Sequence, residues 1–255
     1  NERDIGLSIS SILLQSYGDF ELIIVNDASV DRTPRILDTF AALDARIRVI
    51  HNDRNVGRAS SRNMAIRTSQ GDLIAIQDAD DVALRDRLER QARYLESHPD
   101  VGMLGAWAAT IADRTVQPDV VCSPVDDRTL RHLLEMGRMP LVHSTMMFRR
   151  AAVISSGLYD GRFLRSQDYL LCRSLIEITV AGCVAECLEL YRIDDYFDRR
   201  TVKDRYGWAA RAVWHGLLFS QRPNVLALAN AARLKCLSVL PGRVISHLQA
   251  ASLKS

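Results

Sequence analysis

The N-terminal part of the chain alternates between short apolar runs and stretches with helical spacing, and polar residues gather where each apolar run ends. Apolar, β-branched runs of this length are typical of strands buried within a sheet. A repeated order of strand, polar loop and helix favours a parallel sheet with helices on its faces. The predicted strands are 20–25, 47–50 and 73–76, and the predicted helices are 5–14, 34–43 and 58–69.

The run 73–76 is followed by three carboxylates, Asp78, Asp80 and Asp81, within four residues. In open α/β sheets, ligands bind beyond the carboxyl ends of the strands, and hard oxygen ligands suit Mg²⁺ or Mn²⁺. The residues alone leave an alternative open, in which Asp80 or Asp81 caps a helix predicted over 82–97. We expect the strand itself to be buried on both faces of a parallel sheet.

Composition excludes several classes of protein. With 255 residues, of which 47% are hydrophobic and 25% charged, the chain is long enough for one large α/β domain and is not expected to be disordered. A net charge of +2 is too small to indicate a nucleic-acid partner. The five cysteines lack the spacing of a zinc site, and no signal peptide or membrane-crossing run is visible, so we expect a cytoplasmic protein.

Three motifs occur in order: NDAS at 26–29, NVG at 55–57 followed by SRN at 61–63, and DADD at 78–81. With these motifs, residues 1–193 resemble a family 2 glycosyltransferase of the GT-A fold, and three motifs in register are far more specific than one. The resemblance implies an α/β protein, built as a three-layer α/β/α sandwich with a mixed, mostly parallel sheet.

The resemblance also divides the chain. It implies a nucleotide-binding part at about 1–110 and an acceptor part at about 111–193. Relatives open with an apolar strand, and we expect this strand to be missing here because Asn1 aligns with its end. Residues 194–255 form a basic, aromatic-bearing extension, in which helices are predicted at 206–219 and 225–240. Such helices either lie on an anionic membrane surface, here the inner face, or pack against the catalytic domain or a second subunit in an oligomer.

Carried over onto this sequence, the resemblance assigns Asp27 to a hydrogen bond with the nucleotide base and Arg62 to the nucleotide. It assigns Asp78 to the ribose or a metal-bound water and Asp80 to the metal, Mn²⁺ or Mg²⁺, with Asp81 as a secondary candidate. Judged from residue type alone, Asp27 stabilises a loop and Arg62 forms a surface ion pair. Asn26 stands where many relatives have a second Asp.

The second half of the chain is expected to supply a catalytic base. A strand is predicted at 101–109, a helix at 128–137, and an apolar strand with a polar interruption at 140–148. The next helix carries Asp168 where relatives have their general base, and Gln167 replaces their usual Glu. From its residue type alone, Asp168 favours the helix dipole in a first turn. His143 and Gln167 are secondary candidates for contact with donor or acceptor.

The resemblance implies an inverting, metal-dependent transfer of a sugar from a nucleotide-diphosphate sugar, with UDP as the default, to an acceptor hydroxyl. The acceptor is expected to be a glycan or a lipid-linked glycan in cell-surface polysaccharide or lipopolysaccharide synthesis. Two alternatives remain open. One is a non-catalytic relative that binds nucleotide sugars, and the other is a haloacid-dehalogenase-like phosphatase, which also places Asp-x-Asp after an apolar strand.

Overall fold

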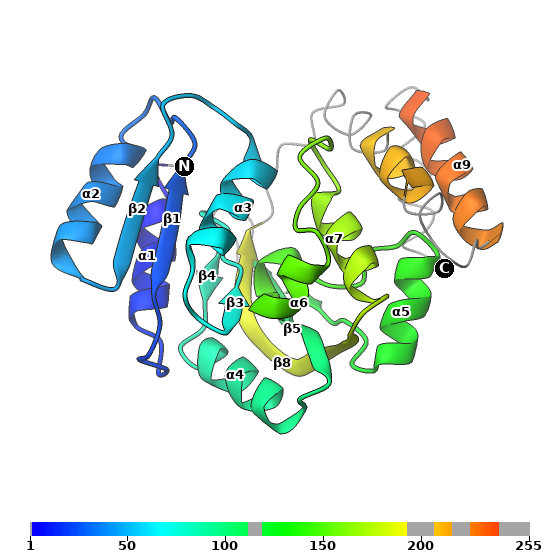
Figure 1. Cartoon of the computed structure of the whole chain (residues 1–255), viewed down its shortest axis with the longest axis horizontal. Helices are drawn as coiled ribbons and strands as arrows, with labels where there is room; N and C mark the ends of the chain where they lie inside the picture. The colour runs from blue at the N-terminus through cyan, green and yellow to red at the C-terminus, as the bar shows by residue number, and fades with distance from the viewer. Residues whose placement is uncertain (1, 112–118, 193–206, 216–224, 240–255) are drawn as a thin grey trace.

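The computed structural model describes residues 2–111, 119–192, 207–215 and 225–239, and its strands form two sheets (Figure 1). The smaller sheet pairs β1 (Leu22–Asn26) with β2 (Ile47–His51) in parallel. Ile9 of α1 (Ile5–Leu13) and Leu37 of α2 (Thr33–Leu43) pack with Ile47 in the core of this sheet. A third helix, α3 (Arg58–Thr68), lies beside β1, but its buried Ala59 and Ile66 belong to the cluster of the larger sheet.

The larger sheet has the strand order β3–β7–β5–β8–β4, and β6 pairs with β5. The β5–β8 pairing is parallel, whereas the β3–β7, β5–β7, β4–β8 and β5–β6 pairings are antiparallel. The structure is therefore mixed, as expected, with parallel pairing confined in the described ranges to β1–β2 and β5–β8. The strands are β3 (Leu73–Ala75), β4 (Val82–Ala83), β5 (Val101–Ile111), β6 (Val120–Val121), β7 (Met147–Arg149) and β8 (Val180–Arg192).

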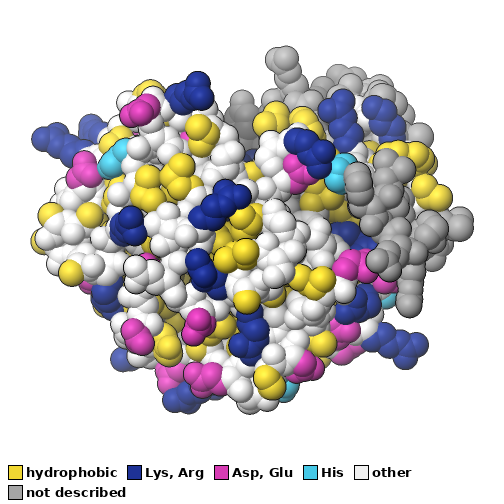
Figure 2. All heavy atoms as spheres, in the orientation of Figure 1, with side chains coloured by type: hydrophobic (Ala, Val, Ile, Leu, Met, Phe, Trp, Pro, Cys, Tyr) yellow, Lys and Arg dark blue, Asp and Glu magenta, His cyan; other side chains and the backbone are white. Residues whose placement is uncertain are grey.

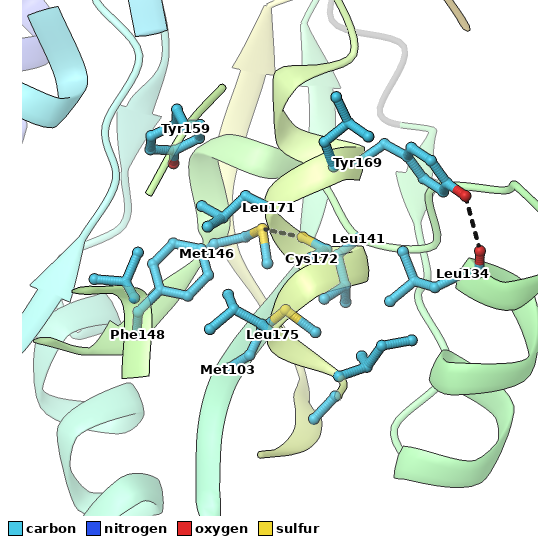
Figure 3. Packing of buried hydrophobic residues seen from close by; sticks show 14 of the residues in the cluster. Met103, Leu134, Leu141, Met146, Phe148, Tyr159, Tyr169, Leu171, Cys172 and Leu175 are labelled. Carbon is cyan, nitrogen blue, oxygen red and sulfur yellow. Dashed lines mark hydrogen bonds between the residues drawn. The ribbon is translucent and has the colours of Figure 1, made fainter. Parts of the chain in front are cut away.

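Helices cover both faces of the larger sheet. On one face, α4 (Arg87–Ser97) packs its Leu95 in a cluster with Leu104 and Met147. On the other face, Met103 and Phe148 pack against Leu171 of α7 (Gln167–Leu175) (Figure 3). Because successive strand residues point to opposite faces, the sheet is the middle layer of three. The remaining elements are α5 (Asp127–Glu135), α6 (Arg150–Ser155), the 3₁₀ helix η1 (His143–Thr145) and α9 (Val225–Val239).

The C-terminal extension is helical where it is described, at residues 207–215 and in α9. Val213 and Ala231 belong to the same buried cluster as Leu171. The Asn230 amide of α9 donates to the carbonyl oxygens of Met136 and Gly137, 3.2 and 3.1 Å away, at the end of α5. The described part of the extension therefore packs against α5 and the buried cluster that contains Leu171, which is one of the two arrangements expected from the sequence. In the described ranges, no helix combines the length and hydropathy needed to cross a bilayer.

Three predictions for the larger sheet are wrong. β3 is not buried on both faces of a parallel sheet, because it pairs antiparallel with β7 and Ala75 is exposed. The helix predicted over 82–97 begins only at Arg87, since Val82 and Ala83 pair with β8, so neither Asp80 nor Asp81 is its cap. The strand predicted over 140–148 is mostly replaced by η1, and only its end belongs to β7.

A groove of about 860 Å³ lies between the two sheets. Leu22 and Ile23 of β1 line it from one side, and Leu73 and Ala75 of β3 line it from the other. Within the described residues, β1 pairs only with β2 and β3 only with β7, so each has one edge without a neighbouring strand. An additional central strand would fit between these edges. The expectation of a missing first strand stays a prediction.

Candidate active site

Residues 77–81 follow β3 and form an acidic loop whose backbone is held by several elements. The Ser8 hydroxyl of α1 donates to the carbonyl of Asp78 (2.9 Å), and the Gln77 side-chain amide donates to the carbonyl of Asp81 (2.9 Å). Arg192, at the end of β8, donates its Nε–H to the carbonyl of Asp80 (3.2 Å). The path of the acidic loop is therefore fixed by the fold itself.

Asp78 forms an ion pair with Arg62 of α3, with 2.6 Å between Oδ1 and Nη2. Both side chains are partly buried, with exposed fractions of 33% for Asp78 and 23% for Arg62. Burial alone would raise the pKa of Asp78, but the positive charge of Arg62, assisted by other cations nearby, outweighs burial and lowers the pKa. Asp78 is therefore ionised near neutral pH, with Arg62 as its counter-ion.

Tyr159 connects Arg62 to His143. The guanidinium lies 5.7 Å from the centre of the Tyr159 ring, and the Tyr159 hydroxyl shares a hydrogen bond of 2.8 Å with Nε2 of His143. Asn63 of α3 holds the backbone of Tyr159, donating to its carbonyl (2.8 Å) and accepting from its N–H (2.9 Å). Burial lowers the pKa of His143 and Arg62 lowers it further, so its imidazole is neutral at pH 7.

Asp168 lies in the first turn of α7, after Ser166, whose left-handed backbone (φ 60°) precedes the helix. Its side chain is partly exposed, and no hydrogen bond or ion pair of this carboxylate is found among the described residues. The negative charges of Asp78 and Asp168 both oppose the effects of burial and Arg62 on the pKa of His143. The structure thus brings Arg62, Asp78, His143 and Asp168 together from four separate segments.

Asp27, directly after β1, uses both carboxylate oxygens to hold the loop 52–57. Oδ1 accepts from the N–H of Val56 (2.8 Å) and the side-chain amide of Asn52 (3.0 Å), and Oδ2 accepts from the N–H of Gly57 (2.8 Å). Burial alone would raise the pKa of Asp27, but these hydrogen bonds outweigh it and lower the pKa. Because Gly57 precedes α3, Asp27 also positions the helix that carries Arg62.

Asp81 and Gln167 are buried and hold the scaffold. Asp81 is 1% exposed, its Oδ1 accepts from the N–H of Arg192 (2.8 Å), and burial raises its pKa to about 6. Gln167 donates its side-chain amide to the carbonyl of Phe163, in the turn before α7. The structure therefore places neither side chain where a ligand has open access to it.

A buried ion pair that sequence reasoning missed supports the acidic loop. Arg87 and Glu189 are both fully buried and pair with each other; burial raises the pKa of Glu189, and the positive charge of Arg87 opposes this rise. Arg87 also donates to the carbonyl of Ile76 (2.6 Å) and the side-chain oxygen of Gln77 (2.8 Å). Glu189 lies among apolar residues of β8, which is a signal of a buried partner, but that partner is 102 positions away.

Ser8 and Arg192 were also missed, since their residue types and spacing carry no distinctive pattern. Asn63 belongs to the SRN motif, but its contacts with the backbone of Tyr159 were not expected. The donor set of the acidic loop fits a divalent cation that is shared with a ligand. In the described part of the chain, no group of three or more His, Cys, Asp or Glu side chains is arranged to hold a metal. Mg²⁺ is commonly held by one or two carboxylates together with substrate phosphates and water, and Asp80 with Asp78 offers such a pair.

Comparisons with known proteins bear on the family and the fold of the chain. Residues 1–157 match the family model described as Glycosyl transferase family 2. An uncharacterized glycosyltransferase of Methanocaldococcus jannaschii is 32% identical over 213 residues, which cover 81% of this chain and 73% of that protein. A Bacillus subtilis protein named as a teichuronic acid biosynthesis glycosyltransferase, TuaG, is 40% identical over 96 residues, which cover 37% of this chain and 38% of TuaG.

Solved structures share the fold at low sequence identity. S. aureus TarS 1-349 in complex with UDP-GlcNAc gives a TM-score of 0.68 at 14% identity, over 91% of this chain and 68% of that chain. The mannosyltransferase PcManGT from Pyrobaculum calidifontis, in complex with GDP-Man and Mn²⁺, gives 0.67 at 17% identity, over 98% and 76%.

The fold is thus that of the GT-A class. With its motifs and the match over most of its length, the chain belongs to glycosyl transferase family 2. The resemblance drawn from the three motifs is confirmed, and the phosphatase alternative is removed.

Proposed function

We propose that the chain transfers a sugar from a UDP-sugar to an acceptor hydroxyl, with inversion at the anomeric carbon, in the synthesis of a cell-surface polysaccharide or related glycan. The observation that carries this proposal is the convergence of Arg62, Asp78 and Asp168 beside a loop suited to a shared cation. The relative named for teichuronic acid biosynthesis and the fold neighbours bound to nucleotide sugars support the class of donor and product.

On the acceptor side, Asp168 is the general base. It accepts the proton of the acceptor hydroxyl while the acceptor oxygen forms a bond to the anomeric carbon, and the bond from that carbon to the diphosphate oxygen breaks. Attack opposite the leaving group inverts the anomeric centre. Asp168 suits this role because it is partly exposed and no described residue occupies its carboxylate.

On the donor side, Arg62 and Asp78 orient the nucleotide diphosphate and the ribose. A divalent cation held by Asp80 would supply neutralisation of the charge that develops on the leaving diphosphate. Asp27 accepts a hydrogen bond from the base through a lone pair that its loop contacts leave unused, since a carboxylate offers about four acceptor sites. His143, kept neutral, holds Tyr159 against Arg62.

The test is the thermal stability of the full chain with UDP, GDP and their sugar derivatives, with and without Mn²⁺. We expect UDP to raise Tm only with the metal, because a ligand that binds the native state raises apparent stability. This shift should vanish in Asp80→Asn and persist in Asp168→Asn, whereas both variants should lose transfer. Nucleotide binding without turnover on any acceptor would favour the non-catalytic alternative, and no nucleotide response at all would overturn the proposal.

A further inference from the structure

A second pocket, of about 700 Å³, lies away from the acidic loop, between the turn before α7, the helical residues 207–215 and α9. Aromatic side chains form much of its wall: Phe163, Trp208 and Trp214 all line it. The Phe163 ring meets the Trp208 ring edge to face, with 6.2 Å between their centroids. Trp214 is 53% exposed. A pocket of this size with an apolar wall suits a small-molecule ligand with a substantial apolar part.

The rim of this aromatic pocket is basic. Arg162, Arg211 and Lys235 line it, and no Asp or Glu is among its described lining residues. Arg162 is paired with Asp160, whereas Arg211 lies 5.0 Å from the centre of the Trp208 ring and Lys235 is exposed on α9. In Figure 2, hydrophobic and basic side chains lie next to one another at the end of the molecule that carries α9. An apolar wall under a basic rim is complementary to an amphipathic anion.

The aromatic pocket is joined to the proposed catalytic base through a short stretch of chain. The carbonyl of Phe163 accepts the hydrogen bond from Gln167, the residue before Asp168. The other wall is also fixed, because Asn230 ties α9 to the end of α5. The pocket therefore lies on the acceptor side of the site rather than on the side of Asp27 and Arg62.

We propose that the aromatic pocket binds the apolar chain of a lipid phosphate, with Arg211 and Lys235 at the phosphate. This inference rests on the proposed function, and it assigns the acceptor of that reaction to the class of glycans linked to a lipid phosphate. The apolar chain occupies the space beside Trp208 and Trp214, and the glycan extends past Phe163 toward Asp168.

The test uses isothermal titration calorimetry of the full chain with dodecyl phosphate below its micelle concentration. Two variants alter the pocket: Ala232→Phe fills it, and Lys235→Glu reverses a charge on its rim. Their matched controls, Ala229→Phe and Arg233→Glu, change exposed positions of α9 that do not line it. We expect each pocket variant to weaken binding at least tenfold, each control to bind as the unaltered protein does, and UDP binding to stay unchanged in all four.

Three outcomes would overturn the proposal. If dodecanol or inorganic phosphate alone bound as tightly as dodecyl phosphate, the ligand would not need both an apolar chain and a phosphate. If the control variants lost as much affinity as the pocket variants, the ligand would not bind in the aromatic pocket. Binding of anionic phospholipid vesicles that neither pocket variant weakens, without binding of monomeric dodecyl phosphate, would assign this face to a membrane surface. The UDP titration separates the two proposals, since dodecyl phosphate binding without any nucleotide response would support the pocket and contradict the proposed function.

Discussion

The loops that follow β1 and β3 use their carboxylates in opposite ways. After β1, the Asp27 carboxylate accepts three hydrogen bonds and is itself what fixes the neighbouring loop. After β3, backbone carbonyl oxygens and the buried Asp81 carboxylate accept the bonds that fix the loop, and the Asp78 side chain instead meets Arg62. A position at the carboxyl end of a strand therefore does not determine whether a carboxylate can serve a ligand. The hydrogen-bond donors and cations that surround the carboxylate determine it.

The largest expected effect concerns the proposed general base, Asp168. Asp168→Asn should lower kcat by about 10²–10⁴-fold, the range that a general base contributes, while the free energy of unfolding stays nearly unchanged. Steady-state kinetics and urea denaturation measure the two quantities. Glu177→Gln, a partly exposed carboxylate past the end of α7, is the control and should leave kcat unaltered. A large loss of stability in Asp168→Asn would show that Asp168 supports the fold, as the buried Asp81 does, and is not a free general base.

Removal of the buried support of the acidic loop should have the next largest effect. Arg87→Ala leaves Glu189 buried without its counter-ion and should lower the free energy of unfolding by about 3–5 kcal/mol. Arg90→Ala, on the exposed side of the same helix, should cost less than about 1 kcal/mol. Similar losses for both variants, measured by urea denaturation, would show that the buried pair gives no particular support.

Asp81 offers a pH test of a fully enclosed carboxylate. Burial raises its pKa to about 6 in the folded chain, whereas the unfolded chain has the ordinary value of 3.8. Between these values the folded state keeps a proton that the unfolded state has released, so the free energy of unfolding falls as pH rises.

In Asp81→Asn this dependence is absent. The unfolding free energy of the variant relative to the unaltered chain should therefore rise by about 2 kcal/mol between pH 4 and 6. Urea denaturation at several pH values measures it. If the difference between Asp81→Asn and the unaltered chain did not change with pH, water would reach this carboxylate.

The smallest effect is expected at Asp27. Asp27→Ala removes the acceptor of the Val56 and Gly57 N–H groups, but both lie near solvent, so we expect a loss of only about 1 kcal/mol in the free energy of unfolding. Asp27→Asn retains one acceptor oxygen and should lose less. If UDP affinity falls in Asp27→Asn while stability does not, Asp27 serves the nucleotide as Asp78 is proposed to do, although the contacts of the two carboxylates differ.

Sequence patterns were sufficient to predict a helix or strand where the signal lies within one segment. The helix predicted at 58–69 is α3, and the strand predicted at 101–109 is β5, because the residues of each segment alone indicate its type. β4 was missed because Val82 pairs with Leu190, more than a hundred positions away. β3 was placed in the wrong environment because its partner, β7, belongs to the second half of the chain.

For the site, motif spacing identified residues but not their contacts. Asp78 and Asp81 are equivalent as sequence features, yet the first is partly exposed beside Arg62 and the second is enclosed where the Arg192 N–H reaches it. The contacts of Tyr159 could not be predicted, since Asn63, which holds its backbone, lies 96 positions earlier. Such differences arise from tertiary packing, which one sequence does not encode in any local pattern.

The groove between β1 and β3 has a consequence for how the two sheets are joined. In the described ranges, each of these strands has one edge without a strand neighbour, and both edges flank the same 860 Å³ space. Unpaired edges of this kind are templates for strand pairing. A single strand that pairs with both edges would join the two sheets into one and satisfy the backbone groups of both edges at once.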